Sequence, residues 1–153
     1  MTTGMMTDPQ EIRRFIRAGH AIFTLVSQVT GARFTYNVAA PTRQTSAGGY
    51  VREYSNDNRF VRLLIGAEDD YAYLAWLKRD TLIHGGAKAC ASTEARSWKA
   101  LWYLWNHMIQ HNAMPSKVEF WHSGHCGRCG RQLTVPESVA HGIGPECIGK
   151  VIG

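Results

Sequence analysis

The first apolar pattern along the chain is a helical stripe. Its apolar members are Ile12, Phe15 and Ile16. Asp8 precedes the stripe and Pro9 opens it. An aspartate side chain accepts hydrogen bonds from the free N–H groups of a first helical turn, and a proline there loses no hydrogen bond. The pattern predicts a helix that begins at Pro9 and ends before Gly19.

Runs rich in β-branched and aromatic residues follow the helix and predict strands. They cover residues 21–26, 32–38, 59–65, 71–77, 81–84 and 117–121. The first two runs flank Thr30-Gly31 and the next two flank a polar turn, so each pair predicts an antiparallel hairpin. Residues 40–58 are dense in turn-forming residues, and we expect a long mobile connection there that carries Arg43 and Arg52.

A second helical pattern spans residues 93–111, with Ser92 or Thr93 as the expected N-terminal cap. Its expected apolar face consists of Trp98, Leu101, Trp102, Trp105, Met108 and Ile109. A stripe of this kind is typical of a helix packed on a core. The elements together predict an α+β fold, in which an antiparallel sheet packs against this long helix.

The composition is that of a chain that buries a core. Hydrophobic residues make up 44% of the 153 residues and charged residues 19%. No run approaches the roughly 18 apolar residues that a membrane span needs, and residues 1–20 lack the apolar segment of a secretory signal. We therefore expect a cytoplasmic protein without a membrane partner.

Three of the four cysteines crowd into residues 126–147. Cys126 and Cys129 form a Cys-x2-Cys turn, and Cys147 follows. Because a secretion signal is not expected, this spacing favours structural zinc over a disulfide framework. A redox pair is the alternative, but it leaves Cys147 unexplained. We expect an α+β body over residues 1–116 and a zinc-binding module, treble-clef-like or zinc-ribbon-like, over residues 117–153.

A tetrahedral zinc site needs a fourth ligand, or leaves that position open. His122 is the preferred candidate because it ends an apolar strand and Gly124 lets the chain fold back toward Cys126. His141 comes second, since flexible glycines flank it, and His125 third, since it adjoins a cysteine. The sequence thus predicts the ligand set Cys126, Cys129, Cys147 and His122.

The module carries a wider signature over residues 122–149. From Cys126 to Cys147 it reads C-x2-C-G-R-x-L-T-x-P-x-S-x3-G-I-G-P-x-C. This run resembles a zinc-finger-like domain of unknown function found in bacteriophage, mobile-element and bacterial proteins. The resemblance implies zinc binding and a phage setting, and hence the cytoplasm of a bacterial host cell. It implies no activity.

The chain is basic, with 17 Lys and Arg against 12 Asp and Glu, a formal net charge of +5. The arginines favoured for phosphate binding are Arg13, Arg17, Arg33, Arg43 and Arg52. Aromatic residues interleave with the arginines of the body; they include Phe34, Tyr36, Phe60, Tyr71 and Tyr73. Because arginine neutralises phosphate and exposed rings stack on bases, the pattern favours a DNA- or RNA-binding protein.

Two other functions fit the same chain. A small basic protein could instead bind a host protein and inhibit or redirect it. The histidines near the cysteines also allow a metal-dependent nuclease. No phosphate-binding glycine loop, Ser-His-Asp set or paired carboxylates stand out, so we expect binding without catalysis.

Overall fold

The computed structural model of the protein describes residues 4–151. Its strands are β1 (Gly4–Met6), β2 (His20–Ser27), β3 (Arg33–Ala39), β4 (Thr42–Gln44), β5 (Tyr50–Arg52), β6 (Asn58–Leu64), β7 (Tyr71–Lys78), β8 (Thr81–His84) and β9 (Val118–His122). Its helices are α1 (Pro9–Arg17), the short 3-10 helix η1 (Gly86–Lys88), α2 (Arg96–His111) and α3 (Pro136–His141). In this part of the chain no helix combines the length and the apolar character that a membrane crossing requires.

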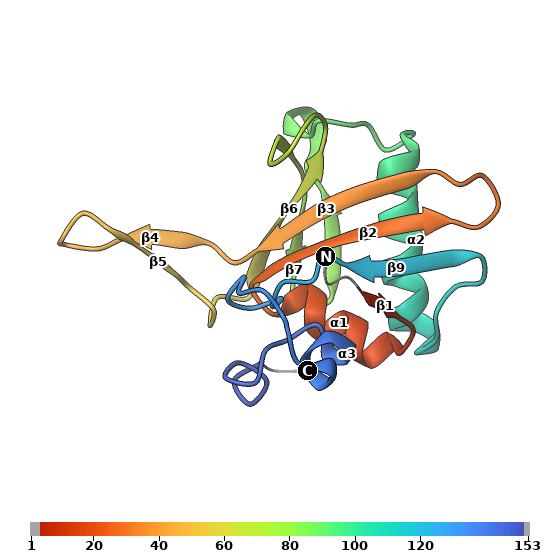
Figure 1. The fold of residues 1–153 in the computed structure, drawn as a ribbon. Helices are drawn as coiled ribbons and strands as arrows, with labels where there is room; N and C mark the ends of the chain where they lie inside the picture. The colour runs from red at the N-terminus through yellow and green to blue at the C-terminus, as the bar shows by residue number, and fades with distance from the viewer. Residues whose placement is uncertain (1–3, 152–153) are drawn as a thin grey trace.

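The fold is α+β and is built on one large antiparallel sheet (Figure 1). Seven strands pair in the order β1-β9-β2-β3-β6-β7-β8. The two predicted hairpins are confirmed as β2–β3 and β6–β7. The predicted short strand at residues 81–84 is β8, which pairs with β7.

The predicted N-terminal cap is confirmed for one of the two main helices, α1, and is wrong for the other, α2. Asp8 caps α1 as predicted, because its Oδ1 accepts a hydrogen bond from the Gln10 N–H at 2.9 Å. The predicted cap of α2 was wrong: its N-cap is Ala95, which makes no side-chain capping bond. Ser92 instead accepts from the Glu94 N–H, within the turn that precedes α2.

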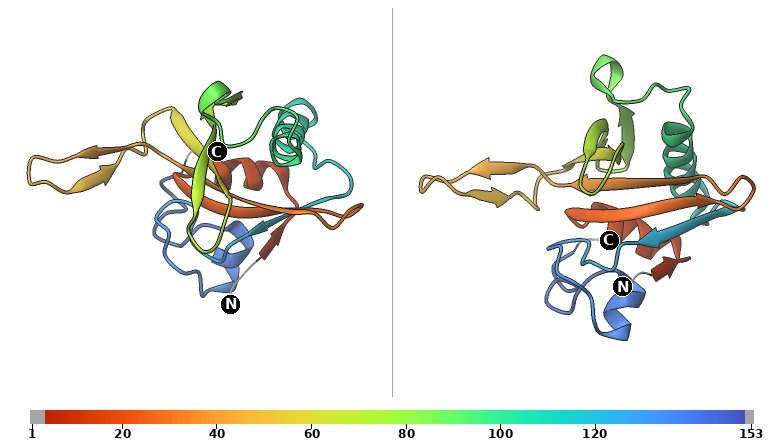
Figure 2. Two further views of the ribbon diagram at one scale, coloured as in Figure 1. Left: turned by 90° about the horizontal axis from the view of Figure 1, so that it is seen from above. Right: turned by 45° about the horizontal axis from the view of Figure 1, so that its top comes forward.

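The helices α1 and α2 pack on the same face of the large sheet, and the core lies between the helices and that face (Figure 2). The Phe23 ring stacks between Tyr36 and Phe120, with centroids 5.3 and 4.7 Å away. The buried Tyr36 hydroxyl donates to the Ser97 carbonyl at 2.7 Å and so ties β3 to α2. Trp102 departs from the predicted buried stripe of α2, because it is 48% exposed.

Residues 40–58 form an ordered ribbon where we expected a mobile connection. β4 and β5 pair with each other outside the large sheet, and Figure 1 shows them projecting from the body. The turn between them closes on Thr45, whose N–H donates to Gly49 O at 2.7 Å. The proline and glycines that suggested a loop therefore start and turn a two-stranded ribbon.

β9 belongs to the sheet of the body. It pairs with β2 on one side and with β1 on the other, from Gly4↔His122 to Met6↔Phe120. The division that we expected at residue 117 therefore moves to the end of β9. The cysteine module proper follows His122, and its helix α3 lies beside α1 and β1 (Figure 1).

Candidate metal centre and open sheet face

Three cysteine side chains converge in the C-terminal module. Cys126 and Cys129 come from one tight turn, and Cys147 comes from the segment that follows α3. Their Sγ atoms all lie within 4.8 Å of one another. Sulfurs bound to one tetrahedral zinc at about 2.3 Å each would lie roughly 3.8 Å apart. The donor set therefore fits a single thiophilic metal ion.

The backbone around Cys126 favours the thiolate that a metal binds. The N–H groups of Gly144 and Arg128 donate to its Sγ at 3.3 and 3.4 Å. Burial opposes ionisation of this thiol, but the backbone N–H groups, first that of Gly144, outweigh burial and hold the Cys126 pKa below its ordinary value. Gly130, with a φ of +80°, lets the turn close after Cys129.

Arg128 links the centre to the body of the protein. Its Nη1 lies 3.7 Å from the Cys147 Sγ, where it offsets thiolate charge. The same guanidinium sits 3.9 Å above the Tyr54 ring, and the Tyr54 hydroxyl donates to the Arg128 carbonyl at 2.9 Å. Arg131, from the same turn, instead pairs with Glu146, with its Nη1 3.4 Å from the Glu146 Oε2.

His122 does not join the cysteines, and the ligand assignment made from its spacing is corrected here. Its Nδ1 accepts a hydrogen bond from the Gly124 N–H at 3.0 Å. Its Nε2 therefore carries the proton and donates to the Val139 carbonyl at 2.6 Å. The ring lies on the core side of β9, 5.9 Å from the Phe15 ring, and both nitrogens are used. A metal has no free lone pair to bind there.

The other two histidine candidates do not join the cysteine cluster either. His141 Nδ1 lies 2.6 Å from the Glu11 carboxylate, so it connects α3 to α1. His125 is exposed and pairs with Gln132 in an isolated bridge. Among the described residues, the cluster with metal-binding geometry is made of the three cysteines.

The buried His122 ring gives a pH-dependent contribution to stability. Burial lowers the His122 pKa from its ordinary value of 6.5, against a smaller opposing effect of the Val139 carbonyl. Below about pH 6.5 the unfolded ring therefore takes up a proton that the folded ring does not. We expect the free energy of unfolding to fall with decreasing pH, by up to about 1.4 kcal/mol per unit from this group.

The titration is followed by NMR of the His122 ring carbons in the metal-loaded protein. A midpoint below 6.5 is expected, and His122→Gln should keep the bound metal. If the His122→Gln variant loses the metal, His122 is a ligand after all and the correction made above is wrong.

Phe15 joins the module to the body, a role that its helical spacing did not reveal. Its fully buried ring meets Phe120 edge-on, at a centroid distance of 5.9 Å. Two glycines of the module also lie against this ring: a Cβ added at Gly127 or at Gly142 would approach it to 2.6 Å. The metal-binding turn therefore rests directly on α1, and only glycine fits at these two positions.

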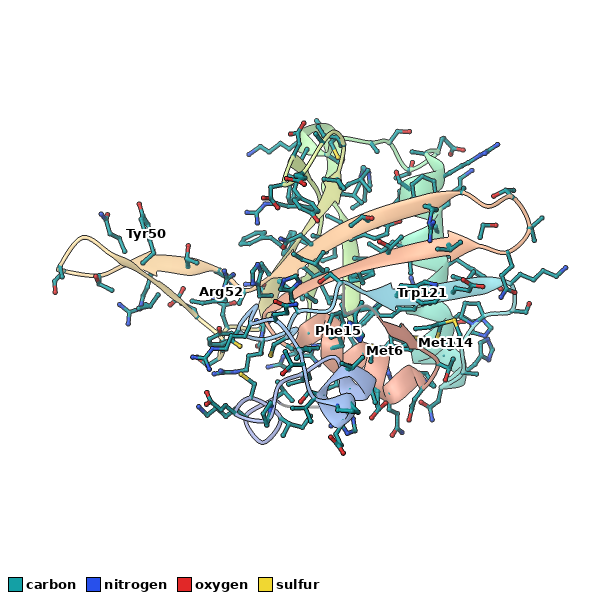
Figure 3. All side chains as sticks on the ribbon, in the orientation of Figure 1. Met6, Phe15, Tyr50, Arg52, Met114 and Trp121 are labelled. Carbon is teal, nitrogen blue, oxygen red and sulfur yellow. The ribbon has the colours of Figure 1, made fainter. Side chains whose placement is uncertain are left out.

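The five predicted phosphate-binding arginines do not form one patch. Arg13 and Arg17 lie on α1, where Arg13 donates to Asn112 and Arg17 pairs with Asp80 at 3.5 Å. Arg43 and Arg52 lie on the ribbon, and Figure 3 shows Arg52 where the ribbon meets the body. Arg33 alone of the five lies on the sheet, on β3.

A different set of side chains gathers on the sheet face opposite the two helices. Alternate residues of a strand point to opposite faces, and the core takes Phe23, Tyr36 and Leu63. The strand register therefore places the following residues on the other side, which we call the open face: Thr24, Arg33, Thr35, Asn37, Phe60, Arg62, Tyr73, Trp76 and Trp121.

The open face corrects our choice of aromatic residues. Tyr36 was a stacking candidate, but it is fully buried in the core. Trp76 and Trp121 were not chosen, although they alternate with buried neighbours on β7 and β9 and that alternation was the available signal. Arg59, also basic, is buried and donates to four backbone carbonyls, so it holds the chain before β6 in place.

Comparison with known proteins gives a family match over the C-terminal module. Residues 119–152 match a family of unknown function, DUF6011. No curated protein and no solved structure matches the chain. The match agrees with the expectation of a domain of unknown function in this module.

Proposed function

We propose that the protein is a zinc-stabilised nucleic-acid-binding protein without catalytic activity, of the kind that phages carry. The proposal rests first on the open face, which combines two exposed arginines, Arg33 and Arg62, with the rings of Phe60, Tyr73, Trp76 and Trp121. Arginines that neutralise phosphates and rings that stack on bases are the two components of a sheet surface that binds nucleic acid.

Zinc supports this function as a structural ion. Three thiolates within reach of one ion, with backbone N–H groups directed at Cys126, suit zinc better than the oxygen-preferring cations. The remaining coordination position is supplied by none of the three histidines that we considered. When bound, the ion would hold the Cys126–Cys129 turn in place against Phe15. It would also keep Arg128, which belongs to that turn, over the Tyr54 ring. In this proposal the metal fixes the module and takes no part in a reaction.

Charge on the open face is uneven. Glu119 lies opposite Val26 on this face, and its carboxylate accepts hydrogen bonds from Gln28 and Trp121 at 3.0 Å each. This carboxylate partly offsets Arg33 at the β9 side. Arg62 lies between Asn37 and Tyr73 in the register, farther along the sheet. The strongest attraction for phosphate is therefore expected at the Arg62 side.

Reversing two charges on the open face tests the proposal. In Arg33→Glu/Arg62→Glu, binding of labelled 20-nucleotide DNA and RNA should weaken for all sequences alike. The slope of log affinity against log salt should also flatten by about 1.4 to 1.8, because two phosphate contacts are lost. Fluorescence anisotropy over a series of salt concentrations measures both quantities.

A matched control makes the same change of charge on the other side of the molecule. Arg96→Glu/Lys99→Glu reverses two exposed charges on α2 and should leave the salt slope unchanged. Equal losses in the two double variants would mean that net charge alone drives binding and would contradict a specific face. Cleavage of the labelled strands with added Mg²⁺ would overturn the assignment as a binding protein.

A protein partner is the second candidate, and one observation favours it. Trp102 and Tyr103 are adjacent on α2 and both nearly half exposed. Large apolar side chains exposed together are typical of protein contacts. If no DNA or RNA binds at low salt, and if Trp102→Ala/Tyr103→Ala prevents recovery of a host protein that wild type retains, the partner is a protein.

A further inference from the structure

A cavity opens on the open face at the root of the ribbon. Its volume is about 310 Å³, and its walls include Asn37, Thr42, Arg52, Phe60 and Arg62. These residues come from β3, β4, β5 and β6, so the cavity lies where the large sheet and the ribbon meet. Its size falls at the lower end of the range for ligand sites, about 300–1,000 Å³, which suits one small planar group with its attached phosphate.

Asn37 contributes a side-chain amide to the wall of this cavity, and one atom of that amide, Oδ1, lacks a hydrogen-bond partner within residues 4–151. In the register it lies opposite Ile22 on one side and Arg62 on the other. Its Oδ1 is buried and accepts no hydrogen bond from the described residues. Buried polar atoms without a partner are rare in native proteins, so this atom calls for an explanation. A side-chain amide offers both donors and acceptors, which is the chemistry that pairs with the edge of a nucleobase.

Phe60 adds a stacking surface beside Asn37. It is 37% exposed and lies opposite Trp76 in the register. An exposed ring on a strand offers a flat apolar surface, and stacking on such a ring tolerates any base.

The cavity has two arginines in its wall and, among its described lining residues, no carboxylate that would offset their charge. Arg62 is exposed, and Arg52 is fixed by hydrogen bonds from its Nη1 to the carbonyls of Ala40 and Gly19, at 3.2 and 3.4 Å. Neither aspartate nor glutamate is among its lining residues in the described chain. The neighbouring cavity beside Arg17 and Arg79 differs, because Asp57 and Asp80 pair with those arginines. The Asn37 cavity is thus the better site for a phosphate.

We infer that this cavity binds one unpaired nucleotide of a single-stranded nucleic acid, with its base stacked on Phe60 and hydrogen-bonded to Asn37 and its phosphate at Arg62. The inference rests on the proposed function and narrows it to single strands. In a duplex both faces of each base are stacked and its pairing edge is used, so a duplex cannot insert a base into the cavity without unpairing it.

The experiment compares a 12-nucleotide single strand with the blunt-ended duplex that it forms with its complement, as DNA and as RNA. Wild type should bind the single strand at least tenfold more tightly. Phe60→Ala should weaken single-strand binding by roughly tenfold and leave the salt slope unchanged, because it removes stacking and no phosphate contact. Tyr103→Ala, an exposed ring on α2, is the matched control and should bind like wild type.

Base preference tests Asn37 separately. Affinities for oligo(dA), oligo(dC) and oligo(dT) should differ for wild type and converge in Asn37→Ala, since the amide is the group that reads the base edge. Photo-cross-linking with a strand that carries one 5-bromouridine adds a readout that needs no variant. The cross-link is expected at Phe60 or an adjacent wall of the cavity.

The outcomes separate this inference from the proposed function. Equal binding of single strand and duplex, with Phe60→Ala unchanged and the salt slope still sensitive to Arg62, would overturn the inference and leave nucleic-acid binding standing. Absence of binding to either form would overturn both. Thermal unfolding of each variant checks that a lost affinity is not a lost fold; cross-links elsewhere on the open face would contradict the cavity.

Discussion

Cys126→Ser is expected to abolish stoichiometric metal binding and to unfold the module after His122, while the large sheet keeps its structure. The buried Cys126 sulfur receives two backbone N–H groups and is the centre of the three-cysteine cluster. Few apolar residues hold the module otherwise; between residues 123 and 151, the buried ones outside the cluster are Leu133 and Ile143. Binding of structural zinc contributes about 10–16 kcal/mol in peptides of similar size, so loss of one thiolate outweighs this small core.

Elemental analysis of protein purified without added zinc measures the stoichiometry, and NMR reports the two parts of the chain separately. Wild type should carry one zinc ion per chain. Cys90→Ser is the matched control, because Cys90 is exposed and lies outside the cluster. A metal-free wild type with a disulfide between Cys126 and Cys129 would establish the redox alternative instead.

Phe15→Ala is expected to lower the free energy of unfolding by about 3–5 kcal/mol, as for other fully buried phenylalanines. The effect should extend to the module, since the ring contacts Phe120 in the sheet and occupies the space beside Gly127 and Gly142. Zinc affinity should therefore fall together with stability. Urea unfolding and competition with a zinc chelator measure the two effects.

Phe60→Ala provides the comparison, because its ring is partly exposed on the open face and its removal should cost about 1 kcal/mol or less. If Phe15→Ala destabilises the body but leaves zinc affinity unchanged, the module does not depend on this contact.

The sequence correctly predicted those structural features that depend mainly on residues close together in the chain. The cap at Asp8 and the hairpins follow from residues near each other in the chain, and these features are present. The Cys-x2-Cys turn with a third cysteine also carried enough information to predict the cluster. For the cap and the hairpins, residues near each other in the chain supply the interactions; for the cluster, the Cys-x2-Cys spacing supplies two of the three sulfurs.

The errors arose where distant residues decide. His122 has a suitable spacing from Cys126, but the pairing of β9 with β1 and β2 places its ring on the core side. The position of Val139 then fixes the proton on Nε2. The spacing of cysteines and histidines in the sequence predicts neither the strands that pair with β9 nor the contact between His122 and Val139. The arginines were grouped by composition, whereas the register separates Arg33 and Arg62 from those on α1.

The ribbon shows a third kind of error. Proline and glycine mark turns, and they gave no indication that three residues on each side would pair. Figure 3 shows Tyr50 on the ribbon, away from the body, where no core contact constrains the sequence. A pattern of buried and exposed positions, on which strand prediction depends, is therefore missing there.

The place of β9 between β1 and β2 has a consequence for the order of folding. β1 pairs with β9 alone, so residues 4–6 must wait for residues 118–122 before they can join the sheet. Contacts over such separations form late, because the intervening chain must first be closed into a loop. On the ribosome the hairpins can form early, whereas β1 stays unpaired until β9 has emerged. The cysteines Cys126 and Cys129 emerge directly after β9, so metal uptake and closure of this sheet edge fall in the same stage of synthesis.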